Sequence, residues 1–385
     1  MKKISVSIVV GLTLVLMVSC ASRNLRPHFK NEIDPKTKRE VLSRKWTYSI
    51  EPYSSALKVP SMEYVSPVLY ENSLVFGSSR FGLVSLYPKI LREKWKLPIE
   101  HGVVSPIELN ANRAYFTAGD GKLYSVSLDN GKTIWSYDLR NPVSSKPTID
   151  GADLYITTSD DALVSLETNT GKWQWNYRRR NVSGPTIHGA SKPLVVGENI
   201  WVGFADGALV ALTRKEGKVL WEKQLNTGKR FGSVNAEFLL AGEHVYVPAY
   251  DGALYMLDSK TGSTLWVREG LGGSKKVTLK DGVIYSPSSS GDLYAVDANT
   301  GKDVWKFETD TGIPSDVAVV GNHVVVSSSS EYLYALDKTT GKLVYRYQVG
   351  YGSGFSGGMA FDSTRNLIYV LSRGGNLMAF NYHSR

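Results

Sequence analysis

The chain has 385 residues but only one cysteine, Cys20. One cysteine excludes an internal disulfide and any metal site built from several cysteines. The six histidines are scattered without the spacing of metal ligands, and neither a Cys-x-x-Cys-His haem motif nor a phosphate-binding loop occurs. From these absences we expect no enzymatic activity, no bound cofactor and no metal.

The chain also lacks an apolar run long enough to cross a bilayer. Its longest such stretch, residues 4–17, follows Met1-Lys2-Lys3 and holds fourteen residues, which favours an export signal over a transmembrane helix. A small residue directly before Cys20 resembles the bacterial lipobox, in which that cysteine is acylated (for example with palmitate) and becomes the mature N-terminus. We therefore expect a signal peptide at 1–19 and lipidation of Cys20. An ordinary secretory signal with an incidental cysteine is the alternative.

Residues 20–42 are polar and basic and contain Pro27 and Pro35, so we expect a lipidated N-terminus followed by a flexible tether. In enterobacterial lipoproteins an Asp after the cysteine favours retention in the inner membrane. Ala21 stands there instead, which by resemblance directs the protein to the outer membrane. The net charge of +9 comes without an aromatic-plus-basic pattern typical of nucleic-acid binding, and we expect a solvated basic surface and no nucleic-acid partner.

One short stretch recurs along the rest of the chain. In its clearest copy, residues 291–305 (GDLYAVDANTGKDVW), an alternating apolar run is followed by a Thr-Gly-Lys turn and a tryptophan. Eight copies open at residues 82, 121, 161, 207, 252, 291, 331 and 375, which lie 39 to 46 positions apart. A period of about 40 residues predicts a repeat architecture.

Each repeat predicts four short antiparallel strands joined by tight turns. One such sheet cannot cover both of its own faces, and radial repetition buries them in a β-propeller. The aromatic residue that ends each repeat is placed to pack between neighbouring blades, where the ring buries a large area and an indole N–H can reach a backbone carbonyl. These structural docking residues are Trp46, Trp95, Trp135, Trp175, Trp221, Trp266, Trp305 and Tyr345.

The strand count predicts how the ring closes. Eight third strands occur, but only seven fourth strands follow within their own repeats. Residues 43–48 (SRKWTY), with Trp46, match a fourth strand at the start of the chain. We therefore expect an all-β, eight-bladed β-propeller at 43–385, with four-stranded antiparallel blades and the N-terminal strand paired with the C-terminal blade, which removes the free sheet edges.

The AxDxxTGKxxW pattern is similar to the tryptophan-docking motif of quinoprotein, or PQQ-like, propellers. With the lipobox and eight blades, residues 43–385 resemble the BamB family, lipoproteins of the machinery that assembles β-barrel proteins in the outer membrane. The resemblance implies a non-enzymatic scaffold that is lipid-anchored in the outer membrane and faces the periplasm. The implied partners are the POTRA domains of a BamA-like barrel-assembly subunit, other assembly lipoproteins and unfolded outer-membrane proteins.

Two segments carry the partner contact that this resemblance implies. Residues 177–189 (YRRRNVSGPTIHG) are similar to the family's Leu-x-Leu-Arg-Gly-x-Ser-x-Pro stretch, which Arg180, Ser183 and Pro185 match. Both leucines and the glycine of that stretch are replaced. An Asp-Val-Asp stretch of the family falls on residues 233–235 (SVN), so both carboxylates are missing. These departures imply a changed contact or a partner with changed complementary residues.

The spacing of the repeats indicates the same region independently. The longest internal connections from a fourth strand to the next first strand fall at 178–192 and 225–237. Connections longer than the repeat requires are where function is usually placed, and arginine and aromatic residues are favoured at interfaces. The candidate partner-binding residues are Arg178, Arg179, Arg180, Ser183, Pro185, Lys229, Arg230, Phe231, Ser233 and Asn235.

Two other functions stay open. The first is a PQQ-binding quinoprotein-like enzyme, although by resemblance those dehydrogenases carry a vicinal cysteine pair, which a chain with one cysteine lacks. The second is a generic periplasmic protein-binding propeller unrelated to barrel assembly.

Overall fold

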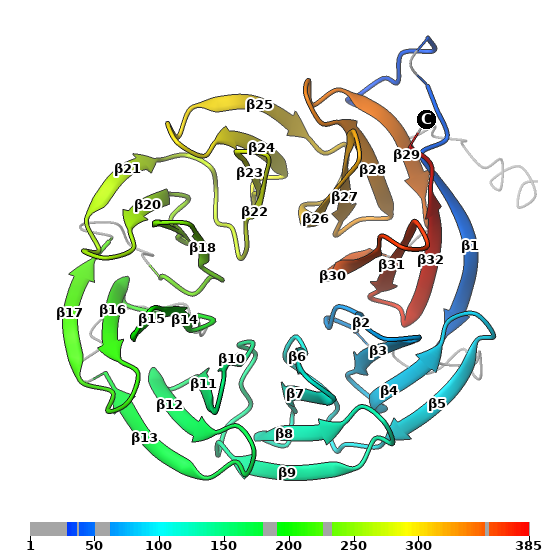
Figure 1. Ribbon diagram of the computed structural model, residues 1–385. Coiled ribbons are helices and arrows are strands. Elements are labelled where there is room, and N and C mark those ends of the chain that lie inside the picture. The colour runs from blue at the N-terminus through cyan, green and yellow to red at the C-terminus, as the bar shows by residue number, and fades with distance from the viewer. Residues whose placement is uncertain are drawn as a thin grey trace, which may run out of the picture.

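The computed structural model describes residues 29–36, 38–50, 62–179, 191–225, 233–350 and 354–384. They form eight four-stranded antiparallel sheets, which Figure 1 shows as the blades of a closed ring. The predicted all-β, eight-bladed propeller is confirmed. The described residues contain no helix long and apolar enough to cross a membrane.

Blade 1 comprises β2 to β5, the following blades take four strands each, and blade 8 comprises β30, β31, β32 and β1. The innermost strands are β2 (Val68–Tyr70), β6 (Glu108–Asn110), β10 (Thr148–Asp150), β14 (Leu194–Val196), β18 (Leu239–Ala241), β22 (Thr278–Lys280), β26 (Pro314–Val320) and β30 (Phe355–Asp362). The second strands are β3 (Ser73–Ser78), β7 (Arg113–Thr117), β11 (Asp153–Thr157), β15 (Asn199–Gly203), β19 (His244–Pro248), β23 (Val283–Pro287), β27 (His323–Ser328) and β31 (Leu367–Ser372).

The third strands are β4 (Gly82–Tyr87), β8 (Lys122–Ser127), β12 (Ala162–Glu167), β16 (Ala208–Thr213), β20 (Leu254–Asp258), β24 (Asp292–Asp297), β28 (Tyr332–Asp337) and β32 (Asn376–Tyr382). The outer strands are β5 (Arg92–Leu97), β9 (Thr133–Asp138), β13 (Trp173–Arg178), β17 (Val219–Gln224), β21 (Thr264–Arg268), β25 (Asp303–Glu308), β29 (Leu343–Gln348) and β1 (Leu42–Ser49).

The N-terminal strand β1 closes the ring by pairing antiparallel with β32, from Leu42 opposite Tyr382 to Ser49 opposite Asn376. Its register shifts between Arg44 and Trp46. The same bulge precedes the repeat tryptophan in other outer strands, for example in β13, where Ser165 faces Trp175 and Leu166 faces Trp173. A bulge bends a strand and redirects its side chains. Since β1 shares this detail, it is a full fourth strand, and the predicted closure is confirmed.

The hydrophobic core lies between the blades. Eight clusters occur in the described part of the chain, and each combines side chains of two neighbouring blades. Between blades 2 and 3, for instance, Tyr115 and Leu123 pack with Leu154 and Ile156. Every residue of β3 is buried, because both faces of a middle strand are covered. One blade therefore depends on its neighbours for its core.

Five repeat indoles donate hydrogen bonds to carbonyls of the next blade, at 2.9 to 3.3 Å. The pairs are Trp95 with Leu128, Trp135 with Thr168, Trp175 with Arg214, Trp266 with Ala298 and Trp305 with Lys338. Trp221 instead meets Trp201 edge to face at 4.8 Å. Trp46 and Tyr345 are partly buried at the two interfaces of blade 8.

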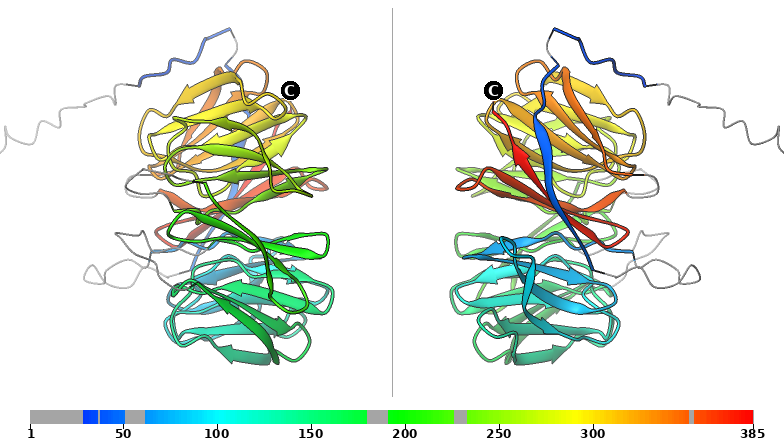
Figure 2. Two further views of the ribbon diagram at one scale, coloured as in Figure 1. Left: turned by 90° about the vertical axis from the view of Figure 1, so that its left-hand side faces the viewer. Right: turned by 90° about the vertical axis from the view of Figure 1, so that its right-hand side faces the viewer.

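The connections between blades share one face with the turns that join second to third strands. In blade 5 the amide of Tyr250 donates to the carbonyl of Ser233 at 3.0 Å, and the amide of Val234 donates to that of Phe204 at 3.0 Å. We call this side the loop face. Figure 2 shows the ring edge-on, with the strands running between the loop face and the opposite face.

Candidate partner-binding site

Arg178 is the last residue of β13 and lies at the loop face of blade 3. Its Nη1 atom lies 2.6 Å from Oδ2 of Asp160, and the two side chains are 57% and 42% exposed. Burial raises the pKa of Asp160, but hydrogen bonds from Thr158 and Arg178 outweigh this and hold the pKa below its usual value. The pair therefore presents a cation and an anion to solvent, and either can contact a partner.

Arg179 has a different role, because it joins blade 3 to blade 4. Its Nε donates to Oδ2 of Asp206 at 2.5 Å, and its Nη1 lies 2.8 Å from Oε1 of Glu222. The guanidinium also lies over the ring of Phe204, 5.8 Å from its centroid. Burial lowers the pKa of Arg179, yet the two carboxylates raise it by more. With only 13% of its side chain exposed, Arg179 positions the corner of the blade rather than presenting its charge.

The second predicted segment, residues 233–235, begins with Ser233, which is fully buried. Its hydroxyl donates to the carbonyl of Ala205 at 2.8 Å, so it fastens the connection to blade 4. Asn235 is half-buried. A parallel bridge between Lys192 and Glu237 holds the ends of the two long connections side by side, as the sequence argument for one common site requires. Six other candidates lie outside the described residues, as does Cys20: Arg180, Ser183, Pro185, Lys229, Arg230 and Phe231.

Sequence reasoning missed one residue at this site, Tyr250. Its side chain is 44% exposed, and its backbone bonds to Ser233 on the loop face. Exposed tyrosines are favoured in protein interfaces. A signal was present, because other blades place a small residue at this point of the repeat, among them Gly119, Ser159, Ala205, Ser289 and Ser329.

Charged side chains precede or begin the innermost strands. Nζ of Lys146 lies 2.7 Å from Oε2 of Glu108, and Nζ of Lys276 lies 3.2 Å from Oδ1 of Asp316. Attraction to Asp316 raises the pKa of Lys276. Lys192 also faces Glu108, at 3.7 Å. Each of these three lysines thus faces a carboxylate of its own chain, and none of the three is left unpaired for an anionic quinone cofactor such as PQQ.

The donor set for a metal is also missing from the described residues, which hold no group of three or more His, Cys, Asp or Glu that could bind an ion. Within the described part of the chain, the residues therefore do not fit a calcium–quinone site of the dehydrogenase kind.

Residues 354–358 (GFSGG) match the Gly-x-Ser-x-Gly pattern of hydrolases letter for letter. That pattern supplies a nucleophile only on a strand-to-helix turn. Here Ser356 lies in β30, and Nε of Arg373 donates to its hydroxyl. Ser356 therefore lies within a strand and not on the turn that presents a nucleophile.

The architecture defines the class of the protein: an eight-bladed propeller with PQQ-like repeats that dock by tryptophan. The chain matches the family model described as outer membrane protein assembly factor BamB over residues 92–307 and 289–384. It belongs to the BamB family. No curated protein sequence matches it significantly.

Solved structures show the same fold. BamB from Moraxella catarrhalis is 19% identical, with a TM-score of 0.73 over 89% of this chain and 100% of that one. Quinohemoprotein alcohol dehydrogenase from Comamonas testosteroni is 13% identical, with a TM-score of 0.74 over 93% and 79%. The computationally designed Ika8 protein is 15% identical, with a TM-score of 0.71 over 84% and 97%. An assembly factor, an enzyme and a designed protein thus have the same fold.

Proposed function

We propose that this protein is a non-enzymatic scaffold lipoprotein of the outer-membrane β-barrel assembly machinery. It docks on the POTRA domains of a BamA-like subunit and helps deliver or fold barrel substrates, alongside other assembly lipoproteins. The observation that carries the proposal is the juxtaposition of the two long connections through Lys192 and Glu237, with Arg178 and Tyr250 exposed beside them. Membership of the BamB family supports the choice of partner.

The proposal includes the expected processing and location. Residues 1–19 are removed as a signal peptide, Cys20 carries the lipid, and residues 20–42 connect it to the propeller at 43–385. Several acyl chains on one residue hold a soluble body at a membrane, whereas a single chain binds only marginally. The propeller then faces the periplasm from the outer membrane.

A pull-down from solubilised membranes with the intact lipoprotein tests the partner. We expect the barrel-forming subunit to be recovered, and recovery at least tenfold lower with the double variant Arg178→Glu, Tyr250→Ala. Arg92→Glu is the matched control, because Arg92 is an exposed arginine of an outer strand in blade 1, away from the site. If the intact protein recovers no assembly subunit, the function is wrong. If the intact protein recovers the assembly subunit and the double variant recovers as much of it as the control, the site lies elsewhere on the ring.

The enzyme alternative is tested with purified protein, PQQ and calcium. A ligand that binds the folded state raises the melting temperature by mass action. The paired lysines and the lack of a metal-binding group in the described residues support our expectation that the melting temperature stays unchanged. A clear rise would favour the quinoprotein reading.

A further inference from the structure

The segment Phe29–Ile33 lies against the ring at blades 6 and 7, as the edge-on views show (Figure 2). The guanidinium carbon of Arg346 lies 3.3 Å from the centroid of the Phe29 ring. The same ring meets Tyr332 edge to face at 5.9 Å, and Ile33 packs against the core between these blades. Stacking of arginine on an aromatic face and edge-to-face pairs are both favourable.

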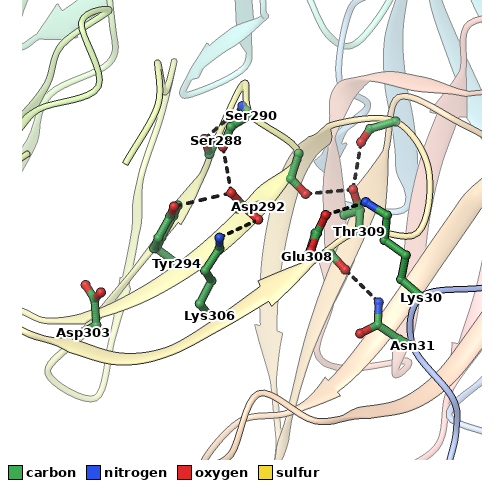
Figure 3. Close-up of polar contacts among 12 residues, drawn as sticks. Lys30, Asn31, Ser288, Ser290, Asp292, Tyr294, Asp303, Lys306, Glu308 and Thr309 are labelled. Carbon is green, nitrogen blue, oxygen red and sulfur yellow. Dashed lines mark hydrogen bonds and ion pairs between the residues drawn. The ribbon is translucent and has the colours of Figure 1, made fainter. Parts of the chain in front are cut away.

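Polar contacts fix the register of the segment. The amide of Asn31 donates to Oδ1 of Asp310 at 2.8 Å, and its side-chain nitrogen donates to the carbonyl of Glu308 at 2.7 Å. Lys30 forms an ion pair with the Glu308 side chain (Figure 3). The Asp310 side chain is 0% exposed, and its other oxygen lies 2.5 Å from Nη1 of Arg346. A buried carboxylate needs such donors, so the segment occupies a specific site.

This site is the counterpart of the candidate partner-binding corner. The amide of Thr309 donates to the carbonyl of Gly291 at 2.9 Å, as the amide of Arg179 donates to that of Asp161 at 3.2 Å in blade 3. Residues 308–310 therefore correspond in the repeat to residues 178–180. At blade 6 the corner is acidic and binds a basic segment of its own chain, whereas at blade 3 it is basic.

We propose that the docked segment Phe29–Ile33 is a clip that shortens the membrane tether and holds blades 6 and 7 towards the membrane. This inference depends on the proposed lipidation of Cys20. From Cys20 to Phe29 the chain has nine steps, which span at most about 30 Å when fully extended. Without the clip the first residue fixed in the ring is near Leu42, 22 steps from Cys20, and the limit is about 75 Å.

The clip also orients the partner site. Figure 1 shows β13 of blade 3 and β29 of blade 7 on opposite sides of the ring. With blade 7 next to the membrane, Arg178 lies on the far side, where a periplasmic partner reaches it. The arginines at positions 23 and 26 lie between the lipid and the clip, and they favour anionic headgroups.

The first test measures docking without lipid. In a secreted Cys20→Ala protein we expect hydrogen exchange to show the Asn31 amide protected, and Phe29→Ala to reduce this protection at least tenfold. Glu32→Gln is the control, since Glu32 is an exposed residue of the same segment. Both substitutions lie outside the strands of the blades. An unprotected Asn31 amide in the parent protein overturns the proposal.

The second test measures orientation in vesicles containing the purified lipoprotein and a headgroup-attached quencher. Fluorophores go on Lys342→Cys in blade 7 or Lys172→Cys in blade 3, which are exposed lysines at the same place in the Thr-Gly-Lys turn. We expect at least twofold stronger quenching at 342 than at 172, and no difference once Phe29→Ala is added.

Equal quenching in the parent, or a difference that survives Phe29→Ala, overturns the clip. A protein with a protected Asn31 amide that fails to associate with vesicles contradicts the proposed lipid anchor instead, and the orienting role falls with it.

Discussion

The indole of Trp135 lies directly on Gly171 of the next blade: a Cβ at position 171 would come within 2.6 Å of the ring. The indole N–H reaches the carbonyl of Thr168 in the same turn at 3.0 Å. The glycine of the Thr-Gly-Lys turn is thus both a turn residue and the surface on which the neighbouring blade docks. The same contact recurs between Trp175 and Gly217.

Gly171→Ala should lower the free energy of unfolding by about 2–4 kcal/mol, since it combines overpacking with a positive φ. Gly151→Ala is the control: its φ of 60° is close to the 70° of Gly171, but a Cβ there meets nothing within 4 Å. It should cost only about 1–2 kcal/mol, for the backbone alone. Denaturant unfolding measures both, and equal losses would contradict the docking role.

Removal of residues 1–49 should open the ring, because β32 loses its partner β1. The contact between Trp46 and Tyr369, whose ring centroids lie 5.8 Å apart, is lost as well. An unpaired strand edge promotes aggregation. We expect that deletion to yield aggregates in size-exclusion chromatography. Deletion of residues 1–39 should leave a folded monomer, since it keeps Val41, Leu42 and the whole of β1. Two soluble products would show that closure is dispensable.

Arg179→Ala should lower the free energy of unfolding by about 2–3 kcal/mol, because it leaves Asp206 and Glu222 without their shared cation. Arg178→Ala should change it by less than about 1 kcal/mol, as expected for an exposed pair. Partner recovery should respond to both substitutions. If stability responds equally to both, Arg179 is no bridge between blades.

The free energy of unfolding should decrease as the pH drops below about 6.5, because of the protonation of His323. This buried side chain bonds through Nδ1 to the Tyr382 hydroxyl at 2.9 Å. Burial lowers the pKa of His323 from 6.5, so the unfolded chain takes up a proton first as the pH drops. The stabilisation is complete above the unfolded pKa, and it is lost between that pKa and the lower folded one.

Unfolding free energies of a His323→Gln protein should therefore depend less steeply on pH in this range than those of the parent. His244→Gln, at the start of the corresponding strand β19, controls for the loss of an imidazole. A parent protein whose stability does not change below pH 6.5 would contradict the assignment.

Most of the ring could be predicted, because each blade of a propeller is encoded by a short local sequence pattern. Turn glycines, alternating apolar residues and one tryptophan recur with nearly constant spacing, and Trp46 matched the missing eighth outer strand. The bulge before each tryptophan was not predictable, since it depends on pairing with the third strand. The Arg346–Phe29 contact joins residues 317 positions apart, and nothing local in either segment indicates it.

The sequence alone determined the number of blades and the closing strand, because both depend on periodicity. It also predicts the neighbourhood of the candidate site, from the places where the periodicity lapses. Only the tertiary structure decided which charges there are available. Arg178 and Arg179 are equivalent in the sequence, yet their environments differ: Asp206 and Glu222 of the next blade enclose Arg179, whereas Arg178 pairs with Asp160 at the surface. The availability of a charge depends on its neighbours in space, and in a ring those come from another repeat.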